Sequence, residues 1–558
     1  MASESLNQPD DGVRGRSQQS PLTSQRSTSP YAARPRPSSG LFPLGYKEGF
    51  SQWWASIPAA VAEHKVLSYV PFLQQAPTHR QTGNVADTPN GAEDSLKSQD
   101  LSQQGEVTAN SVDDPYGPRR WRSSMVELSG KDRALNEFSV ERIGEQADQN
   151  LVILHGYGAG LGFFYRNFEP LSRAKGWQLY ALDMLGMGRS TRPPFKIKAK
   201  NRQDAITEAE DWFIDALEEW RVKRKIERFT LLGHSLGGYM AVAYALKYPG
   251  RLNKLILASP VGIPEDPYAV NADMPEPSET TLANEFTQDS RNVSETASKD
   301  NNNILNQPSK AAAKERDTSD GKPSHPPPSR PIPKWLAYLW DSNISPFSLV
   351  RWAGPLGPRL VSGWTSRRFA HLPAPEAQAL HDYAYSIFRL RGSGEYALAY
   401  ILAPGAFARS PLIRRIHGVG RQIIRPSSEP AMTSTSTPSS ALSATSNSSS
   451  TSVSDDKPQP TPPQPTRENG IPVVLMYGEH DWMDVKGGYA AQAKIEEEKQ
   501  RVLRDATPEE RERDNGSAKV VIIRKAGHHV YLDGWEEFNQ VVLEEMEDVR
   551  RREQKRRN

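Results

Sequence analysis

Apolar residues occur in short, separate stretches of this chain, and several of these stretches end in a glycine-rich turn. Continuous apolar runs of strand length predict buried β-strands at 150–154, 177–182, 229–232, 252–259, 471–477 and 519–523. Apolar residues at helical spacing predict helices over 204–222 and 535–549. Because strands that alternate with helices build a parallel sheet covered on both faces, the pattern favours the α/β class.

A second pattern precedes the first of these runs. Residues 124–143 alternate between apolar and polar positions, which is typical of strands with one buried face. We expect a pair of neighbouring strands here, with Asn136 as the candidate turn between them.

Four tracts are too polar, or too rich in Ser, Thr and Pro, to bury an apolar core. We expect these to be disordered: 1–40, 76–118, 271–330 and 425–468. They dilute the rest of the chain, which explains a mean hydropathy of −0.67 over 558 residues. The remaining residues favour one large domain whose core comes in two parts, 119–265 and 469–558, separated by an insertion over 266–424.

Two segments outside the predicted strands are rich in aromatic residues. Residues 332–417, within the insertion, are helix-prone and are expected to form a cap over the active site, although ordinary helical packing accounts for some of the rings. An apolar cap suggests an apolar substrate such as an acyl chain. The other segment, residues 41–75, contains the adjacent Trp53 and Trp54. It either docks on the domain or lies at a lipid interface, where indole is favoured.

One predicted strand leads directly into a serine motif. Residues 229–232 run into Gly233-His234-Ser235-Leu236-Gly237-Gly238, and a helix-compatible stretch follows at once. This is the context of a nucleophile elbow, in which a tight turn exposes a serine at the end of the sheet. The alternative is a plain strand-to-helix turn whose serine has no role.

An acid and a base follow later strands, in the order that such a serine requires. Asp481 comes after the strand at 471–477, and His528 comes after the strand at 519–523. A serine is a poor nucleophile until an imidazole accepts its proton and a carboxylate orients that imidazole. His529 competes for the role of base and Asp484 for the role of acid.

A glycine-rich turn follows the strand at 150–154. We call residues 155–160, His-Gly-Tyr-Gly-Ala-Gly, the glycine loop. We expect the backbone N–H groups of Tyr157 and Leu236 to form an oxyanion hole. A phosphate-binding loop is disfavoured, because the spacing is not that of a P-loop and no lysine follows.

Composition narrows the chemistry further. The chain has no cysteine, which excludes disulfides, thiolate metal sites and a cysteine nucleophile. With 69 Lys and Arg against 67 Asp and Glu, net charge argues neither for nor against nucleic acid, and we expect no such partner. No apolar run approaches the length of a membrane span. We expect no cofactor and no metal.

The motifs together resemble a known family. HGYGAGLGFFYRNF, DMLGMGRS, GHSLGGYMAVAYALKYP, YGEHDWMD and AGHHVYLD are similar to those of α/β-hydrolase-domain lipid enzymes, a family that includes the fungal mitochondrial cardiolipin-specific deacylase and the lipid-droplet lipase coactivator. The resemblance implies an α/β-hydrolase fold, a mostly parallel sheet flanked by helices with a helical cap insertion and long disordered loops. It also assigns the family's His-x4-Asp acyltransferase pattern to His528 and Asp533. Where the coactivator branch has asparagine at the elbow, this chain keeps Ser235.

These observations lead to one main hypothesis and two alternatives. The first is a serine-dependent hydrolase of phospholipid or lysophospholipid esters, similar to the cardiolipin deacylase. The alternatives are a lysophosphatidic acid acyltransferase and a noncatalytic regulator of a lipid-droplet lipase. The resemblance implies an intracellular protein bound peripherally to a membrane or lipid droplet through residues 41–75. Residues 12–40 contain Arg and Ser but no acid, which hints at mitochondrial import.

Overall fold

The computed structural model describes residues 42–73, 109–110, 114–266, 344–403, 407–424 and 466–557. The tracts expected to be disordered lie outside these residues, apart from the ends of two of them. At one end Asp114 is buried in an ion pair with Arg119, and at the other Thr466–Arg467 forms the short strand β11. The segment that hinted at mitochondrial import also lies outside the described residues.

The centre of the molecule is a nine-stranded sheet in the order β1-β2-β3-β5-β4-β6-β7-β12-β13. Its strands are β1 (Ala109–Asn110), β2 (Arg119–Glu127), β3 (Ala134–Arg142), β4 (Gln149–Leu154), β5 (Trp177–Leu182), β6 (Phe229–His234), β7 (Leu252–Ala258), β12 (Pro472–Gly478) and β13 (Ser517–Ile523). Strands β5, β4, β6, β7, β12 and β13 are parallel to one another, whereas β1, β2 and β3 join antiparallel beside β5 at one edge. The mostly parallel sheet expected from the sequence is confirmed.

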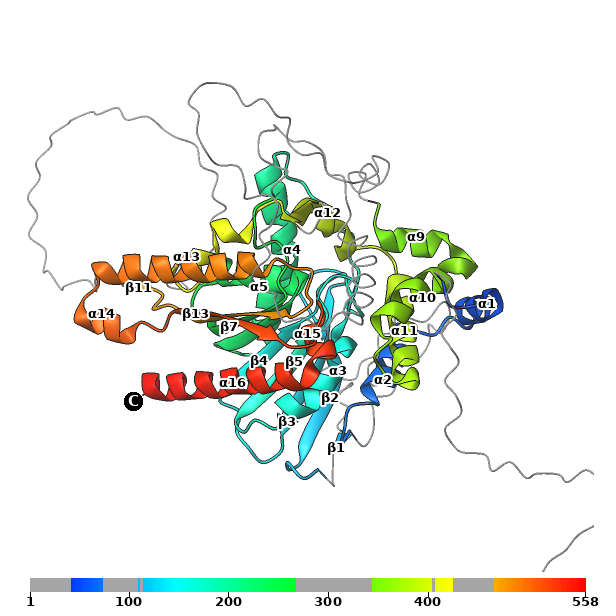
Figure 1. Cartoon of the computed structure of the whole chain (residues 1–558), viewed down its shortest axis with the longest axis horizontal. Coiled ribbons are helices and arrows are strands. Elements are labelled where there is room, and N and C mark those ends of the chain that lie inside the picture. Colours follow the sequence, from blue (N-terminus) through cyan, green and yellow to red (C-terminus); the bar gives the residue numbers. More distant parts are fainter. Residues whose placement is uncertain are drawn as a thin grey trace, which may run out of the picture.

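Helices cover both faces of this sheet (Figure 1). Side chains alternate between the faces along a strand, so Val152 and Leu154 of β4 pack in one core cluster and Leu151 and Ile153 in another. The first cluster includes α4 (Arg202–Lys223), α5 (Leu236–Lys247) and α13 (Val485–Arg504). The second includes α3 (Tyr165–Leu171), α15 (Val530–Asp533) and α16 (Trp535–Arg557).

The insertion after β7 supplies a helical layer beside the sheet (Figure 1). Its helices are α9 (Pro346–Trp352), α10 (Gly357–Arg368), α11 (Ala374–Phe388) and α12 (Leu398–Ile401). Shorter elements complete the described residues: η2 (Leu161–Phe164), η3 (Gly354–Leu356), η4 (Gly394–Ala397), β8 (Leu402–Ala403), β9 (Phe407–Ala408), η5 (Leu412–Arg414), η6 (Ile416–Gly418), β10 (Ile423–Ile424), β11 and α14 (Pro508–Arg513). We refer to α9 to α12 as the cap.

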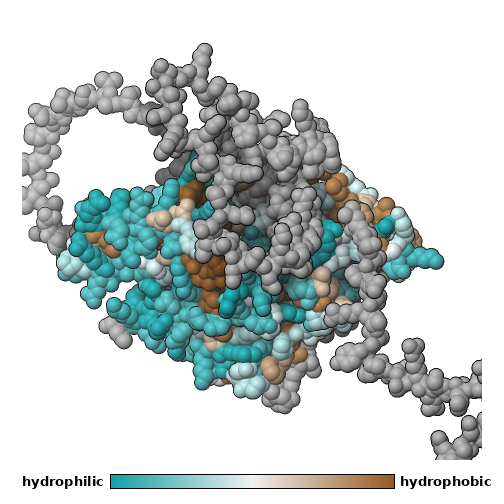
Figure 2. All heavy atoms as spheres, in the orientation of Figure 1, coloured by the Kyte–Doolittle hydropathy of each residue, from teal (hydrophilic) through white to brown (hydrophobic). Residues whose placement is uncertain are grey.

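The Trp-rich segment forms two helices that differ in burial. The second, α2 (Ala59–Leu67), packs on α11 of the cap and buries most of its residues. The first, α1 (Tyr46–Ala55), packs on α10 but buries only Gly49. Its rings face outward, with Tyr46 69% and Trp54 74% exposed. Trp352 of α9 is also exposed. Helices α9 and α1 lie at the same end of the molecule (Figure 1), and Figure 2 shows hydrophobic surface at this end.

The prediction that Asn136 forms a turn is wrong. Asn136 lies inside β3, opposite Met125 of β2, and is fully buried. The hairpin turns earlier, where the Leu128 N–H donates to the Arg133 carbonyl. A buried amide is tolerated in the strand because its Nδ2 donates to the carboxylates of Glu63 and Asp183.

Among the described residues, no helix has the combination of length and low polarity that crossing a bilayer requires.

Candidate active site

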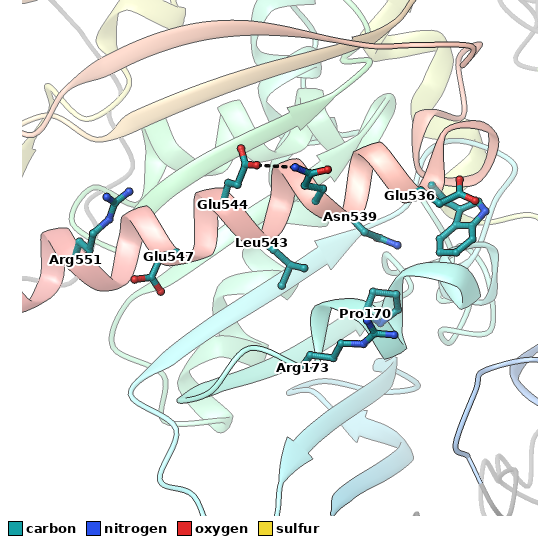
Figure 3. A pocket seen from close by; sticks show the side chains of 10 residues that line it. Pro170, Arg173, Glu536, Asn539, Leu543, Glu544, Glu547 and Arg551 are labelled. Atoms are coloured by element: carbon teal, nitrogen blue, oxygen red, sulfur yellow. Dashed lines mark hydrogen bonds between the residues drawn. The ribbon is translucent and has the colours of Figure 1, made fainter. Parts of the chain in front are cut away.

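One surface hollow lies apart from the candidate residues. It is a groove of about 640 Å³ between α3 and α16, with Pro170, Trp535 and Leu543 on its apolar walls. Figure 3 shows acidic and basic side chains such as Glu547 and Arg551 along its length. None of the residues that line it belongs to the serine motif, the glycine loop or the candidate acid and base.

Ser235 stands at a sharp turn between β6 and α5. Its backbone angles are φ 51° and ψ −114°, a strained conformation for a residue with a side chain. The turn is held because the Ser235 N–H donates to the Ala258 carbonyl of β7 at 3.0 Å. A side chain at Gly233 would place its Cβ 2.3 Å from the Gly237 carbonyl oxygen, so only glycine fits there. This is the local geometry of an elbow that presents a serine at the strand end.

His528 and Asp481 meet at the carboxyl end of the sheet. His528 Nδ1 lies 3.1 Å from Asp481 Oδ1, and both side chains are buried. The same carboxylate oxygen accepts the Met483 N–H at 3.0 Å. Burial raises the pKa of Asp481, but the charge and hydrogen bond of His528, together with hydrogen bonds from neighbouring groups such as the Met483 N–H, more than offset this, so the pKa falls below its ordinary value. An ionised Asp481 therefore faces Nδ1 and fixes the imidazole.

The competing residues are held in other contacts. Asp484 caps α13, where its Oδ1 accepts the Lys486 N–H at 2.9 Å. The ring of His529 packs 5.1 Å from that of His234, and burial holds the pKa of His529 well below its ordinary value. The geometry therefore favours Asp481 as acid and His528 as base.

His234, which precedes the serine, links the two halves of the site. Its Nε2 lies 3.0 Å from the backbone carbonyl of His528. A carbonyl oxygen only accepts, so Nε2 carries the proton and donates. Burial lowers the pKa of His234 well below its ordinary value, which keeps the ring neutral. Sequence reasoning does not select His234 for a chemical role, and its position directly before Ser235 is the signal that could have found it.

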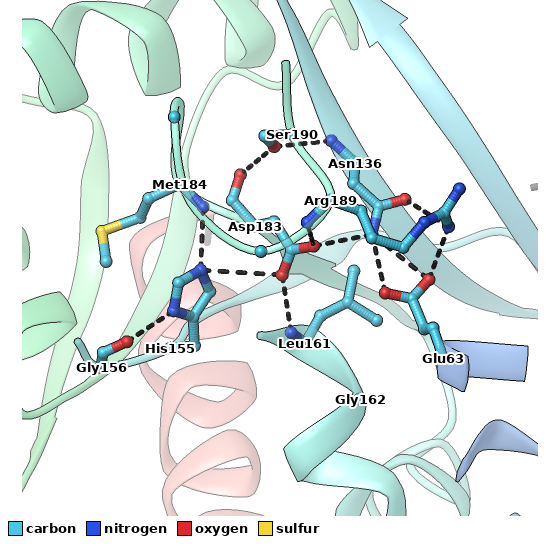
Figure 4. A network of polar contacts seen from close by, with 12 residues as sticks. Glu63, Asn136, His155, Gly156, Leu161, Gly162, Asp183, Met184, Arg189 and Ser190 are labelled. Atoms are coloured by element: carbon cyan, nitrogen blue, oxygen red, sulfur yellow. Dashed lines mark hydrogen bonds and ion pairs between the residues drawn. The ribbon is translucent and has the colours of Figure 1, made fainter. Parts of the chain in front are cut away.

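The glycine loop lies against the elbow. A Cβ at Gly156 would stand 3.0 Å from the Ser235 Cβ, so the two backbones are in close approach. His155 fastens the loop (Figure 4): its Nε2 accepts the Met184 N–H at 3.1 Å, and its Nδ1 donates to the Gly156 carbonyl at 2.7 Å. Burial lowers the pKa of His155 to about 4, so the ring stays neutral at physiological pH. The two expected oxyanion donors, on Tyr157 and Leu236, thus belong to segments that flank Ser235.

Aromatic rings of the cap cover this loop. The Tyr157 ring stacks on Phe347 of α9 with centroids 5.0 Å apart, and Phe347 stacks on Phe388 of α11 at 4.4 Å. Phe347 and Phe388 also lie within van der Waals distance of a Cβ built on Gly158. The surroundings of the candidate oxyanion hole are therefore apolar.

Asp533 connects the His528 turn with the cap. One carboxylate oxygen accepts the Gly527 N–H at 3.2 Å, and the other pairs with Arg368 of α10 at 2.9 Å. His371 Nε2 lies 3.5 Å from that second oxygen. These contacts suit a residue that orients the turn before His528.

Among the described residues, no group of three or more His, Asp or Glu side chains is arranged to hold a metal ion.

Comparisons with known proteins agree with this architecture. The chain is 29% identical over 435 residues to a 1-acylglycerol-3-phosphate O-acyltransferase of Arabidopsis thaliana, covering 77% of this chain and 72% of the relative. It is 28% identical over 432 residues to a mouse (Mus musculus) 1-acylglycerol-3-phosphate O-acyltransferase, covering 76% and 85% of the two chains.

A human (Homo sapiens) relative, a (lyso)-N-acylphosphatidylethanolamine lipase, is 26% identical over 413 residues, covering 73% of this chain and 81% of the relative. The profile of the alpha/beta hydrolase fold family matches residues 149–534, a span that runs from β4 to the end of the His528 turn. The chain therefore belongs to the α/β-hydrolase fold family.

Proposed function

We propose that this protein is a serine-dependent lipid acyl hydrolase. The observation that carries the proposal is the placement of Ser235 in a strained strand-to-helix turn close to the pair of His528 and Asp481, whose side chains are 3.1 Å apart. A hydrogen bond from His234, the residue before Ser235, holds the main chain of His528. A nucleophile, a base and an orienting acid in this arrangement are the parts that acyl transfer to serine requires.

The reaction has two stages. Ser235 Oγ attacks the ester carbonyl carbon while His528 Nε2 accepts its proton, and Asp481 stabilises the imidazolium through Nδ1. The N–H groups of Tyr157 and Leu236 stabilise the oxyanion. The C–O bond breaks, His528 returns the proton to the leaving alcohol, and an acyl-serine remains. Water then attacks this acyl-serine with the same proton transfers, releasing the fatty acid.

The proposed substrate is a phospholipid or lysophospholipid ester. The aromatic cover formed by Tyr157, Phe347 and Phe388 suits an acyl chain, which gains free energy by leaving water. The relatives' names support a lipid, since they are an acyltransferase of lysophosphatidate and a lipase of N-acylphosphatidylethanolamine. Cardiolipin is one candidate, on the family resemblance of the motifs.

Acyl transfer to a lysophosphatidate is the second candidate, because two of the relatives are named for it. It shares the acyl-serine and differs only in the acceptor that attacks it. A noncatalytic lipase regulator is disfavoured, because Ser235, His528 and Asp481 are all retained.

We also propose that α1 attaches the protein to a lipid surface. Tyr46, Phe50, Trp53 and Trp54 lie at positions that share one side of the helix, and each is at least 36% exposed. Aromatic side chains of this kind prefer the interface between lipid and water. The adjoining α9 contributes Trp352, which is 69% exposed.

The test measures fatty acid released from vesicles that contain phosphatidylcholine, its lysolipid or cardiolipin. Wild-type protein is expected to release fatty acid, and Ser235→Ala to release none above background. Asp484→Asn, at the cap of α13, is the matched control and should keep its activity. Release by Ser235→Ala equal to that of wild type would reject the proposal. Adding labelled acyl donor with lysophosphatidate distinguishes transfer, which yields labelled phosphatidate, from hydrolysis, which yields labelled fatty acid.

A further inference from the structure

A carboxylate from the N-terminal segment lies in the interior of the molecule. Glu63 of α2 is completely buried, although it precedes the main domain by more than fifty residues. Its Oε1 pairs with Arg189 Nη1 at 2.8 Å. Its Oε2 accepts the Asn136 Nδ2–H at 3.0 Å and the Tyr383 hydroxyl at 3.0 Å. Helix α2 thereby contacts β3, the turn after β5 and cap helix α11 through one side chain.

The same network continues to a second buried carboxylate, Asp183, at the end of β5 (Figure 4). Asp183 Oδ2 accepts the Asn136 Nδ2–H and the Arg189 N–H, each at 2.8 Å. Asn136 therefore stands between the two carboxylates and donates to both.

From Asp183 the network reaches the glycine loop. Asp183 Oδ1 accepts the N–H of Leu161, the residue that follows the loop, at 2.7 Å. It also lies 3.6 Å from Nε2 of His155, the first residue of the loop. Because His155 is neutral and its Nε2 accepts the Met184 N–H, this second contact is not an ion pair. Asp183 therefore holds the end of the glycine loop through the Leu161 N–H, and Asp183 is itself placed by Asn136 and Arg189.

Tyr383 supplies a second connection from Glu63 to the loop. Its hydroxyl accepts the Gly162 N–H at 3.4 Å while donating to Glu63. A Cβ on Gly160 would lie 2.3 Å from that hydroxyl, so the loop runs directly over the tyrosine. Movement of Glu63 would shift Asp183 and Tyr383 together, since both depend on the same hydrogen-bonded groups.

We infer that Glu63 is a positioning residue for the oxyanion hole, through which helix α2 fixes the glycine loop against Ser235. The inference rests on the proposed function, because it assumes that the Tyr157 N–H in this loop stabilises the reacting oxyanion. In this inference, α2 supports the active site, whereas α1 is the proposed lipid anchor. An oxyanion donor displaced by about 1 Å costs on the order of 100-fold in rate.

The experiment compares Glu63→Gln with Glu545→Gln. Glu545 pairs with the buried Lys254 at 2.6 Å, so its variant also breaks a buried ion pair, but on α16 and away from the glycine loop. Both proteins are assayed on p-nitrophenyl butyrate, a soluble ester that needs no lipid surface. Hydrogen exchange of peptides covering 155–162 is measured in parallel.

Glu63→Gln is expected to lower kcat roughly 10- to 100-fold with KM changed less than about threefold, and to speed exchange over 155–162. Glu545→Gln should show neither effect, even if its thermal stability falls as much as that of Glu63→Gln. If Glu63→Gln does not fold, Tyr383→Phe keeps the charges and is expected to show the same two changes on a smaller scale. Unchanged exchange over 155–162, or an equal loss of kcat in Glu545→Gln, would overturn the inference. Wild-type protein that hydrolyses no ester would reject the proposed function instead, and the exchange measurement would still decide the role of Glu63.

Discussion

Nε2 of His234 donates to the backbone carbonyl of His528 at 3.0 Å, and this hydrogen bond ties the candidate base to the residue directly before the candidate nucleophile. His234 is the last residue of β6 and His528 follows β13, and two strands, β7 and β12, lie between β6 and β13 in the sheet. The bond sets the position of the main chain at His528, while Asp481 sets the orientation of its ring.

His234→Phe keeps an aromatic ring, slightly larger than imidazole, and removes the donor, so the His528 turn loses its fixed position. We expect kcat on p-nitrophenyl butyrate to fall on the order of 10- to 100-fold, because a displacement of a catalytic group by about 1 Å can cost on the order of 100-fold in rate. The fold should persist, as judged by circular dichroism. An unchanged kcat in a folded variant would show that the bond has no role in catalysis.

Asp533 provides a test of the acyltransferase motif. If it acts by orienting the Gly527 turn and Arg368, as its contacts indicate, Asp533→Asn should lower hydrolysis and acyl transfer by the same factor. We expect a loss of about tenfold in each, since a charge-assisted hydrogen bond contributes about 1.5 to 3 kcal/mol. Loss of acyl transfer with hydrolysis intact would instead assign Asp533 a specific part in transfer.

The buried His155 predicts a dependence of stability on pH. Its pKa is lowered to about 4 in the folded protein, against about 6.5 when unfolded, so the unfolded chain binds the proton more readily between these values. The contribution of neutral His155 is complete above pH 6.5 and is lost as pH falls toward 4.

His155→Gln removes this titration. Between pH 7 and pH 4, the free energy of unfolding of wild type should fall by about 3 kcal/mol more than that of the variant, from the shift of about 2.5 units at 1.36 kcal/mol each. Denaturant unfolding at several pH values measures it. If the free energy of unfolding changes with pH in the same way in both proteins, His155 is not a buried neutral residue with a lowered pKa.

If α1 is the lipid anchor, changes in its exposed rings should weaken lipid binding without lowering the rate of ester hydrolysis. Replacing Trp53 and Trp54 with Ala removes exposed rings that touch no candidate catalytic residue. Binding to phosphatidylcholine vesicles should weaken at least about tenfold, because burying one large apolar side chain contributes about 1.5 to 3 kcal/mol. Hydrolysis of p-nitrophenyl butyrate should be unchanged. Full vesicle binding by the double variant would remove α1 as the anchor.

The candidate nucleophile, acid and base can be predicted from the sequence, because each is defined by residues close to it in the chain. Ser235, Asp481 and His528 each follow a strand and a glycine-containing turn, which placed them at one edge of the sheet. The spacing of three residues after the strand-end Gly478 favours Asp481 over Asp484 as the acid. The contacts agree with this preference, because Asp481 faces His528 whereas Asp484 caps α13.

The buried hydrogen-bond network of Glu63, Asn136 and Asp183 could not be predicted from the sequence, because its hydrogen bonds join residues that are far apart in the chain. The sequence predicts a turn at Asn136 because asparagine favours turns. Its burial inside β3 depends on Glu63, 73 positions earlier, and on Asp183, 47 positions later. No periodicity in either segment signals such a partner. The sequence likewise does not predict that α1 is largely exposed and α2 largely buried, because this difference depends on their packing against α10 and α11.

The most direct test of the account is to identify the residue that a fluorophosphonate modifies. After reaction with such a probe, wild-type protein is digested and its peptides are analysed by mass spectrometry. The account predicts one adduct, on Ser235, whose formation is slowed at least about 1,000-fold in His528→Ala, since loss of a triad member costs this much or more. An unmodified Ser235, or labelling that proceeds at the wild-type rate without His528, would contradict it.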